Sequence, residues 1–441
     1  MKLIFLNRFF HPDHSATSQI LSDLAFALAE RGKKVCVITG RQRYDAPKHV
    51  LPTRETIAGV AVHRVWASRF GRTNLSGRAV DYATFYMSAA WRLWCLAERG
   101  DVVIAKTDPP MVSVIAAGVC WLRGARLINW LQDIFPETAQ NLGVGGRAAT
   151  LAYGLMRRLR NRSLMAAHMN VVLGKRMAER VLSFDIPSDR VRIVHNWADG
   201  SAVTPLSHEA NALRGEWELG DAFVVAYSGN LGRAHDVETV LDAMQLVAAA
   251  GDPAMPATSK SAYRSVLWLF IGDGALFGHL KAEVARRGFT SVRFKPYQPR
   301  ALLAKSLSAG DVHLISLRPE LEGLIVPSKF YGIAAVGRPT VFIGDVNGEI
   351  AELVARHQCG RTVAIGNAAQ LSQTVLELAR DEDQCRLLGK HAREAFEAEF
   401  DKPLAIARWE TLLGEISDKP VPEFRRSPGA PESARLPRKA R

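Results

Sequence analysis

The side chains best suited to chemistry gather in one segment of the second half of the chain. There Glu322 and Gly323 stand shortly before Ser328 and Lys329, between two apolar runs that we predict as strands. In a parallel α/β sheet, the loops at the carboxyl ends of the strands bind ligands. A carboxylate can accept hydrogen bonds from sugar hydroxyls, and a lysine with main-chain amides can hold phosphates. The segment therefore indicates a ligand that carries both groups.

Two glycine-containing segments upstream have the pattern of a strand, a turn and a helix. The first contains Ser228, Gly229, Asn230 and Arg233, and the second contains Gly272, Asp273 and Gly274. Small residues let main-chain amides approach an anion, and the amino end of a helix adds partial positive charge. The alternatives are an ordinary tight turn for the first segment and a helix cap at Asp273 for the second. Taken alone, each segment fits its alternative as well as it fits ligand contact.

Tyr297 adds an aromatic ring just after a third predicted strand, where a nucleobase could stack. Glu322 taken alone fits a solvated loop charge. Because three such loops follow strands of one predicted sheet, a shared binding site explains them better than coincidence does.

Strands and helices alternate almost throughout the chain, which is typical of βαβ units on parallel sheets. In the first half we predict strands at residues 2–7, 34–39, 102–106, 126–130, 169–173 and 191–194, and helices at 18–31, 78–99 and 147–163. In the second half we predict strands at 222–227, 266–271, 292–294, 312–316 and 340–344, and helices at 236–249, 275–287 and 368–414.

The polar interval 196–221 interrupts this alternation and marks a domain boundary. We therefore predict an α/β fold of two doubly wound Rossmann-like domains that face each other across a cleft. The predicted units are residues 1–200, residues 201–385, helices at 386–415 that cross back onto the first domain, and a basic tail at 416–441. The tail is rich in proline and has the composition of a disordered segment.

Composition narrows the classes of function. A length of 441 residues fits two domains, and 48% apolar with 23% charged residues is ordinary for a globular enzyme. The five cysteines are scattered, which argues against a disulfide framework or a structural zinc site. The longest nearly apolar run, residues 111–122, is too short to span a bilayer. A net charge of +13 without a nucleic-acid-binding motif favours a membrane surface and phosphate-bearing substrates over nucleic acid.

An ordered set of motifs resembles a known family. The second half contains YSGNLGRAHDVETVL, FIGDGA and EGLIVPSKFYGIAAVGRP, and the first half contains FHPD, TDPP, LQDIFPE and VHNWAD. Over roughly residues 1–410 the chain resembles the retaining, family-four glycosyltransferases of the GT-B type. It is most similar to the branch that makes colanic acid, O-antigen and capsule precursors.

The resemblance implies a nucleotide-sugar donor in the second domain and an acceptor beside the first. By position, Glu322 contacts the donor sugar, assisted by the amides of Gly323 and Leu324. The other implied donor-binding residues are Ser228, Gly229, Asn230, Arg233, Ser328 and Lys329 at the diphosphate, and Gly272, Asp273, Gly274 and Tyr297 at the nucleoside. From the first domain, Asp133 brings a polar side chain to the reaction centre, and Ser15, Ala16 and Thr17 face the donor phosphate and the acceptor.

The sequence departs from the family's pair of glutamates. Phe330 stands eight positions after Glu322, and Gly332 stands where counting back from Gly337 places the second glutamate. Ribose binding thereby loses its usual carboxylate, for which Glu349 is a candidate substitute.

The first glycine segment also departs from the family. Asn230 and His235 stand where the family has an arginine and a lysine. Arg233 is therefore the candidate for the phosphate charge.

The implied reaction transfers a sugar, with retention, to a saccharide linked to undecaprenyl diphosphate. We expect neither a metal nor another cofactor, because cationic side chains can stabilise the leaving diphosphate. Such an acceptor implies a protein at the cytoplasmic face of the cytoplasmic membrane.

The predicted helix at 147–163 supports this membrane location. It combines a stripe formed by Leu151, Leu155 and Leu159 with the basic residues Arg157, Arg158, Arg160 and Arg162. A basic amphipathic helix suits an anionic membrane surface. The alternative is a helix that packs its leucines on the sheet and leaves its arginines solvated.

Three other functions remain open at this stage. A non-hydrolysing nucleotide-sugar epimerase uses a similar scaffold but needs no acceptor. A degenerate transferase that serves as an assembly subunit would explain Phe330 and Gly332. A nicotinamide dehydrogenase is the weakest alternative, because no G-x-G-x-x-G follows the first strand.

Overall fold

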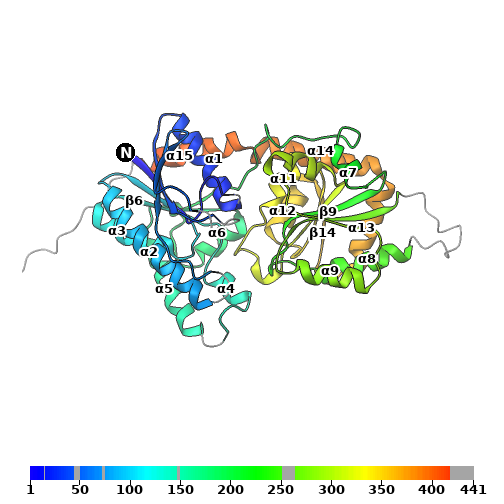
Figure 1. The fold of residues 1–441 in the computed structure, drawn as a ribbon, viewed down its shortest axis with the longest axis horizontal. Helices are drawn as coiled ribbons and strands as arrows, with labels where there is room; N and C mark the ends of the chain where they lie inside the picture. Colours follow the sequence, from blue (N-terminus) through cyan, green and yellow to red (C-terminus); the bar gives the residue numbers. More distant parts are fainter. Residues whose placement is uncertain (14, 44–49, 72–74, 147–148, 251–263, 418–441) are drawn as a thin grey trace, which may run out of the picture.

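The computed structural model describes residues 1–13, 15–43, 50–71, 75–146, 149–250 and 264–417. Nearly all of the predicted tail at 416–441 lies outside the described residues. The described chain forms two parallel-sheet α/β domains side by side (Figure 1). The predicted fold class is confirmed.

The first domain is built on a sheet of eight strands in the order β3-β4-β2-β1-β5-β6-β7-β8. Its strands are β1 (Lys2–Leu6), β2 (Lys34–Gly40), β3 (Arg54–Ile57), β4 (Val60–Val65), β5 (Val102–Ala105), β6 (Arg126–Trp130), β7 (Met169–Val172) and β8 (Val191–Ile193). All neighbours pair in parallel except β3, which forms an antiparallel hairpin with β4. The sequence analysis missed this hairpin, because its outer strand alternates exposed and half-buried residues and lacks an apolar run.

Helices cover both faces of the first sheet. On one face α1 (Ala16–Glu30) packs with α15 (Lys402–Ser417), and on the other lie α2 (Leu75–Leu96) and α3 (Val112–Arg123). Next to α3 lies α5 (Thr150–Ala166), and the short helices α4 (Glu137–Asn141) and α6 (Lys175–Leu182) stand toward the second domain (Figure 1).

The second domain has six parallel strands in the order β11-β10-β9-β12-β13-β14. They are β9 (Phe223–Asn230), β10 (Val266–Asp273), β11 (Val292–Lys295), β12 (Val312–Ser316), β13 (Thr340–Ile343) and β14 (Gly360–Val363). The helices are α7 (Ala212–Glu216), α8 (Glu238–Ala250), α9 (Phe277–Arg286), α10 (Leu303–Ser308), α11 (Lys329–Ala335), α12 (Glu349–His357), α13 (Ala368–Arg380) and α14 (Glu382–Ala395). The sequence analysis did not predict the edge strand β14.

The two domains are connected both by the chain and by side-chain packing. A π-helical turn at Phe396–Phe400 leads the chain from α14 back to the first domain, where α15 lies along α1 (Figure 1). There the ring of Trp409 packs edge-on against Trp130, with the ring centroids 4.7 Å apart. In addition, one apolar core contains residues of both domains, among them Ile134 and Met177 from the first and Leu324 from the second.

Candidate active site between the two domains

A cavity of about 460 Å³ lies between the domains at the carboxyl ends of their strands. The first domain lines it with Ala16 and Thr17, at the start of α1, and with Asp133, which follows β6. The second domain contributes Val326 and Ser328, just before α11. Its other lining residues are Arg8, Phe9, Ile20, Gly71, Arg78, Asp81, Tyr82, Thr107, Asp108, Pro110, Gln132, Leu173 and Asn196. The structure thus brings together four of the predicted site residues, Ala16, Thr17, Asp133 and Ser328. The third residue of the acceptor-side triplet, Ser15, stands just before α1 without a side-chain capping bond and is not among the lining residues.

Asp133 is held directly against the loop that carries Glu322. An antiparallel bridge pairs Asp133 with Ile325, and the amide of Ile134 donates to the carbonyl of Leu324 over 2.9 Å. Burial raises the pKa of the Asp133 carboxyl, and a hydrogen bond with Thr107 partly offsets that rise. A carboxyl group of the first domain therefore stands next to the loop predicted to hold the donor sugar.

Lys106 is a buried cation near the cavity that the sequence analysis missed. It follows β5, its Nζ donates to the carbonyl of Thr17 over 2.9 Å, and it lies 4.0 Å from the ring centroid of Trp130. Burial lowers its pKa to about 7. The sequence signal that could have revealed Lys106 is a lysine directly after an apolar strand. Its contacts show that it supports the start of α1.

The two predicted glycine segments form the ends of two neighbouring strands. We predicted that the strands end at residues 227 and 271, but β9 continues to Asn230 and β10 to Asp273, and Gly229 pairs with Gly272. A Cβ on Gly272 would collide with the carbonyl of Gly229, so the absence of a side chain permits this pairing. The segments therefore converge, as predicted, but as paired strands with their helices beginning further on.

Lys329 reaches the first glycine segment from α11. Its Nζ donates to the carbonyl of Asn230 over 3.3 Å and to Nε2 of His235 over 3.2 Å. It also lies 4.7 Å from the ring centroid of Tyr227. Burial lowers the pKa of Lys329 to about 7.

His235 accepts this bond as a neutral ring. Burial, followed by the nearby Lys329, lowers the pKa of His235 to about 4. Its Nδ1 lies 2.6 Å from the carbonyl of Ser316, to which a neutral ring can donate. The neutral ring of His235 thus orients Lys329. It does so from the position at which the family resemblance implies a lysine.

Glu322 caps the start of α12. Its Oε1 accepts a hydrogen bond of 2.7 Å from the amide of Glu349, and burial raises its pKa. The amide of Gly323 also bonds to this carboxylate, and the amide of Leu324 donates to the carbonyl of Leu321 over 3.0 Å. Both amides expected to assist at the donor sugar form hydrogen bonds within the loop, and their role at the sugar stays a prediction.

Glu349 is not placed as a ribose ligand. Its side chain is buried, and Oε2 accepts a hydrogen bond of 2.8 Å from the amide of Arg176 at the start of α6 in the first domain. A Cβ on Gly174 would collide with this carboxylate, so the two domains meet closely here. The Glu349 carboxylate joins the domains, and the suggested substitution for the missing glutamate is not supported. Gly332 stands at the position of the missing glutamate. It faces Leu307 on α10 and not the cavity.

The remaining predicted donor residues surround the strand ends. Ser228 and Gly229 are half-buried, Asn230 and Arg233 are exposed, and Tyr297 is 55% exposed with its hydroxyl 3.5 Å from the carbonyl of Asp273. Asp273 accepts a hydrogen bond of 2.8 Å from the amide of Gly274 and does not cap α9, which begins at Phe277. Among the described residues, no group of three His, Cys, Asp or Glu side chains is arranged to hold a metal ion.

A second feature of the first domain is an exposed apolar and basic face formed by side chains of α2, α3 and α5. These three helices pack next to one another on one face of the sheet (Figure 1). These helices contain seven arginines and a single acidic residue, the buried Asp81. The exposed apolar side chains are Val80, Met87, Trp91, Trp94, Trp121, Leu122, Leu151, Leu155 and Met165. Leu151 is 90% exposed and Leu155 is 59% exposed, so these two leucines of α5 do not pack on the sheet, whereas Leu159 is half-buried.

The prediction that Arg160 belongs to this basic face is wrong. Arg160 is buried, forms an ion pair of 2.7 Å with Glu137 of α4, and lies 4.1 Å from the ring centroid of Phe184. Because α5 turns this position inward, only Arg157, Arg158 and Arg162 remain partly or fully accessible. Among the described residues, no helix combines the length and apolarity needed to cross a bilayer.

Comparison with known proteins agrees with this architecture. Residues 16–197 match the model of a glycosyl transferase 4-like domain, and residues 222–381 match that of the glycosyl transferases group 1. The chain is a glycosyltransferase of the family-four type. The first match covers every strand of the eight-stranded sheet except β1, and the second covers the whole six-stranded sheet, so the cavity lies between the two domains of a GT-B enzyme.

Two relatives are named as glycosyltransferases. The probable glycosyltransferase WbjE of Pseudomonas aeruginosa is 26% identical over 77% of this chain and 82% of its own. The putative colanic acid biosynthesis glycosyl transferase WcaI of Escherichia coli K12 is 24% identical over 73% of this chain and 74% of its own. One of the two relatives of this glycosyltransferase is thus named for colanic acid biosynthesis.

Solved structures share the fold. Sucrose-phosphate synthase of Thermosynechococcus elongatus superimposes with a TM-score of 0.71 at 17% identity, covering 94% of this chain and 99% of its own. Anabaena HepE in complex with UDP and glucose gives a TM-score of 0.67 at 17% identity, covering 94% of this chain and 100% of its own. The GT-B fold of the glycosyltransferase is therefore established.

Proposed function

We propose that this glycosyltransferase moves a sugar, with retention, from a nucleoside diphosphate donor to a lipid-diphosphate-linked saccharide. The acceptor is an undecaprenyl-diphosphate saccharide in the synthesis of a bacterial surface polysaccharide such as O-antigen, colanic acid or capsule. The reaction takes place at the cytoplasmic membrane surface and uses no metal. The observation that carries the proposal is the cavity between the domains, where Asp133 and Thr17 of one domain meet Ser328 of the other.

The donor is assigned to the second domain. The strand ends at Ser228 and Gly272 lie side by side, and Lys329 stands over the first of them. When the bond between the sugar and the diphosphate breaks, negative charge grows on the leaving diphosphate. Lys329 and the exposed Arg233 would stabilise that charge without a metal ion. The bound UDP of the structurally similar HepE supports a nucleotide donor for this fold.

The acceptor is assigned to the first domain. Its hydroxyl would enter the cavity between Thr17 and Asp133, on the side opposite Ser328. The domains already pack against each other through their shared core, which limits the entry of water that would hydrolyse the donor.

The exposed face of α2, α3 and α5 supports a lipid-linked acceptor. Large apolar side chains such as Trp91, Trp121 and Leu151 stand among arginines with no exposed acidic residue on these helices. Aromatic and apolar side chains insert at the headgroup boundary, and arginines attract anionic lipids. The face belongs to the acceptor-side domain, so an enzyme docked through it would have its acceptor domain at the membrane.

The transfer test offers the purified full chain a panel of nucleotide sugars with an undecaprenyl-diphosphate saccharide. We expect one donor to give a lipid extended by one sugar, detected by mass spectrometry, in the presence of EDTA. Conversion of the donor sugar without an acceptor would favour the epimerase instead. Donor binding with no product from any acceptor would favour a non-catalytic assembly subunit.

The membrane test measures binding to vesicles that contain phosphatidylglycerol. Replacing Arg157, Arg158 and Arg162 by Gln removes three charges, each worth about 1 kcal/mol near an anionic surface, and should weaken binding by roughly 100-fold. Trp91→Ser should weaken it further, whereas Leu387→Ser, at an equally apolar position 50% exposed on α14, should not. Unchanged binding in the arginine variant would remove the membrane assignment.

A further inference from the structure

The cavity between the domains contains a carboxyl group to which the proposed function assigns no task, that of Asp108. Three neighbouring strands of the first sheet, β1, β5 and β6, end at this part of the cavity. The lining residues that follow them are Arg8, Asp108 and Asp133, respectively. Because β5 is the middle strand of the three, Asp108 belongs to the same part of the cavity as Asp133, where the acceptor hydroxyl is assigned.

The main chain of Asp108 is fixed, but its carboxyl group is free. The carbonyl of Asp108 accepts a hydrogen bond of 2.6 Å from the amide of Arg8. In the part of the chain that the structure describes, no hydrogen bond or ion pair involves the carboxyl oxygens of Asp108. The side chain is half-buried and lines the cavity, so these oxygens are available to a ligand.

The other two aspartates that line the cavity are already engaged. The carboxylate of Asp81 accepts hydrogen bonds from the hydroxyl of Ser68 at 2.7 Å and from two main-chain amides of the same loop at 3.0 and 3.2 Å. The carboxyl of Asp133 bonds to Thr107. Among the described lining residues, Asp108 is therefore the aspartate that keeps its full capacity to accept hydrogen bonds.

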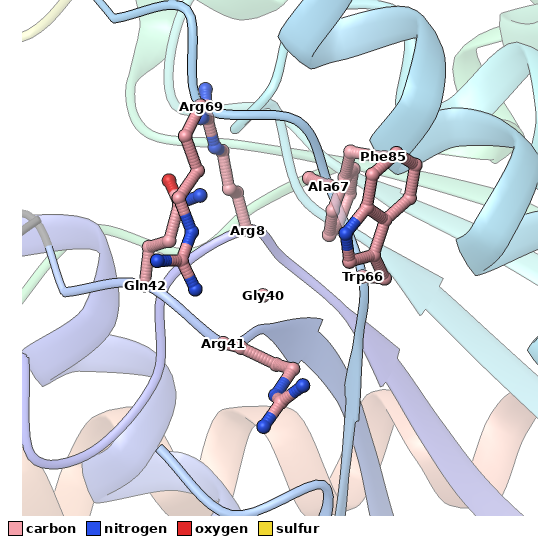
Figure 2. A pocket seen from close by; sticks show the side chains of 8 residues that line it. All are labelled: Arg8, Gly40, Arg41, Gln42, Trp66, Ala67, Arg69 and Phe85. Carbon is pink, nitrogen blue, oxygen red and sulfur yellow. The ribbon is translucent and has the colours of Figure 1, made fainter. Parts of the chain in front are cut away.

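Arg8 gives the same part of the cavity a hydrogen-bond donor. It also borders a small pocket with Gly40 and Arg41, but Figure 2 shows its guanidinium group pointing away from both. The guanidinium carbon lies 5.1 Å from the ring centroid of Tyr82, which lines the cavity as well. Within the described ranges no ion pair involves Arg8, so its N–H groups can donate to a ligand beside Asp108.

The electrostatics around Asp108 favour a ligand that donates hydrogen bonds. Burial raises the pKa of Asp108 to about 6, and the negative charges of Asp133 and Asp13 raise it further. The positive charges of Arg8 and Lys106 partly offset this rise. At neutral pH the carboxyl is thus mostly ionised but poorly solvated, and hydrogen bonds donated by a ligand would stabilise the charge.

We propose that Asp108 binds the acceptor sugar by accepting hydrogen bonds from one hydroxyl group or from two neighbouring ones. This assignment rests on the proposed function and adds to it a residue that selects the acceptor. Sugar hydroxyls both donate and accept, which matches a carboxylate with a guanidinium group, that of Arg8, beside it. The reacting hydroxyl stays beside Asp133, so Asp108 orients the sugar and receives no proton in the transfer.

The experiment uses the acceptor that the transfer test identifies, on a short-chain prenyl diphosphate, and analogues that each lack one hydroxyl of its terminal sugar. With the analogue that lacks the hydroxyl bound by Asp108, the native protein should lose about 10- to 100-fold in kcat/KM, the range for a hydrogen bond to a charged group. Asp108→Asn should show a similar loss with the complete acceptor and within about threefold no further loss with that analogue. The KM of the donor should not change.

The control variant is Asp189→Asn, at an exposed aspartate just before β8, and it should behave as the native protein with every acceptor. Equal losses in Asp108→Asn and the native protein for every analogue would overturn the proposal, as would a native protein that tolerates them all. A rise in the KM of donor and acceptor alike, with a lowered melting temperature, would show a purely structural role and overturn it too.

Direct binding keeps this proposal distinct from the proposed function. If the native protein extends no lipid-diphosphate saccharide, the proposed function fails, and saturation-transfer NMR with octyl glycosides of hexoses and N-acetylhexosamines still tests Asp108. Binding of at least one glycoside that Asp108→Ala weakens by about tenfold or more supports the assignment. No binding of any glycoside, or equal binding by the variant and the native protein, overturns it.

Discussion

The carboxylate of Glu322 accepts a hydrogen bond of 2.7 Å from the backbone amide of Glu349. One glutamate therefore uses the amino end of α12 as a positive partner, while the side chain of the other bonds to the first domain through the amide of Arg176. The two residues that sequence analysis assigned to the same nucleotide sugar thus have different tasks. The carboxylate of Glu322 is bonded to the start of α12 within the second domain, and Glu349 fastens the domains together.

Substitution of Glu322 should separate capping from catalysis. Glu322→Gln can still accept from the amide of Glu349, so its melting temperature should stay close to that of the native protein, whereas Glu322→Ala loses the cap at a cost of about 1 kcal/mol. Turnover should fall by roughly 10- to 100-fold in both variants, because both lose the charge that receives sugar hydroxyls. Steady-state kinetics beside thermal unfolding provide the check. Full turnover in the Gln variant would refute the role of Glu322.

Lys329 should take up a proton when the donor binds. Its pKa is about 7 in the free protein because the amine is buried, and a diphosphate nearby would raise that value. Donor affinity should therefore be greatest below pH 7 and fall as the pH rises above it. Calorimetry at pH 8 in buffers of different ionisation enthalpy should show uptake of about one proton.

Two variants control the proton measurement. Lys329→Met should bind the nucleotide sugar without proton uptake and more weakly. Lys329→Arg stays charged at pH 8, so it should bind without uptake and with affinity that no longer falls with pH. Unchanged uptake in the Met variant would move the titrating group elsewhere.

Substitutions of two nearby arginines of α5, Arg158 and Arg160, should have different effects. Arg160→Gln leaves Glu137 buried without its ion-pair partner and should lower the free energy of unfolding by about 3–5 kcal/mol. Arg158→Gln, at an exposed position, should change that free energy by less than about 0.5 kcal/mol but weaken vesicle binding. Urea unfolding of both variants is the measurement, and equal stabilities would show that the pair with Glu137 does not form.

Asp108 should make the protein less stable as the pH rises. Burial raises its folded-state pKa from 3.8 to about 6, so the fold favours the protonated carboxyl. That stability is fully present below the unfolded value and is lost as the pH rises through about 6. Asp108→Asn stays neutral, so its melting temperature should exceed that of the native protein at pH 7.5 but not at pH 4. Parallel pH profiles for the two proteins would contradict the assignment.

Sequence analysis located most of the sheet because buried parallel strands are continuous apolar runs. Strands such as β1 and β12 were found for this reason, whereas the hairpin of β3 and β4 lacks such runs. The ends of β9 and β10 were misplaced because glycines usually mark turns. Here they allow Gly229 and Gly272 to pair closely.

The site was predicted less completely than the fold, because its contacts depend on pairs far apart in the chain. Nothing local shows that the amide of Glu349 meets Glu322, or that α5 turns Arg160 inward toward Glu137.

The account depends on one spatial claim, namely that the acceptor enters the cavity from the first domain while the donor is held by the second. Ala16 is exposed at the cavity, small and part of the first domain, so Ala16→Trp should obstruct the acceptor side while the donor residues of the second domain stay in place. The direct measurement is single-turnover sugar transfer by this variant, beside equilibrium donor binding and the control Ala248→Trp on the exposed side of α8. We predict that transfer is lost in Ala16→Trp while the donor still binds to the second domain, losing at most its contact with the start of α1. Native transfer rates in Ala16→Trp would contradict the account.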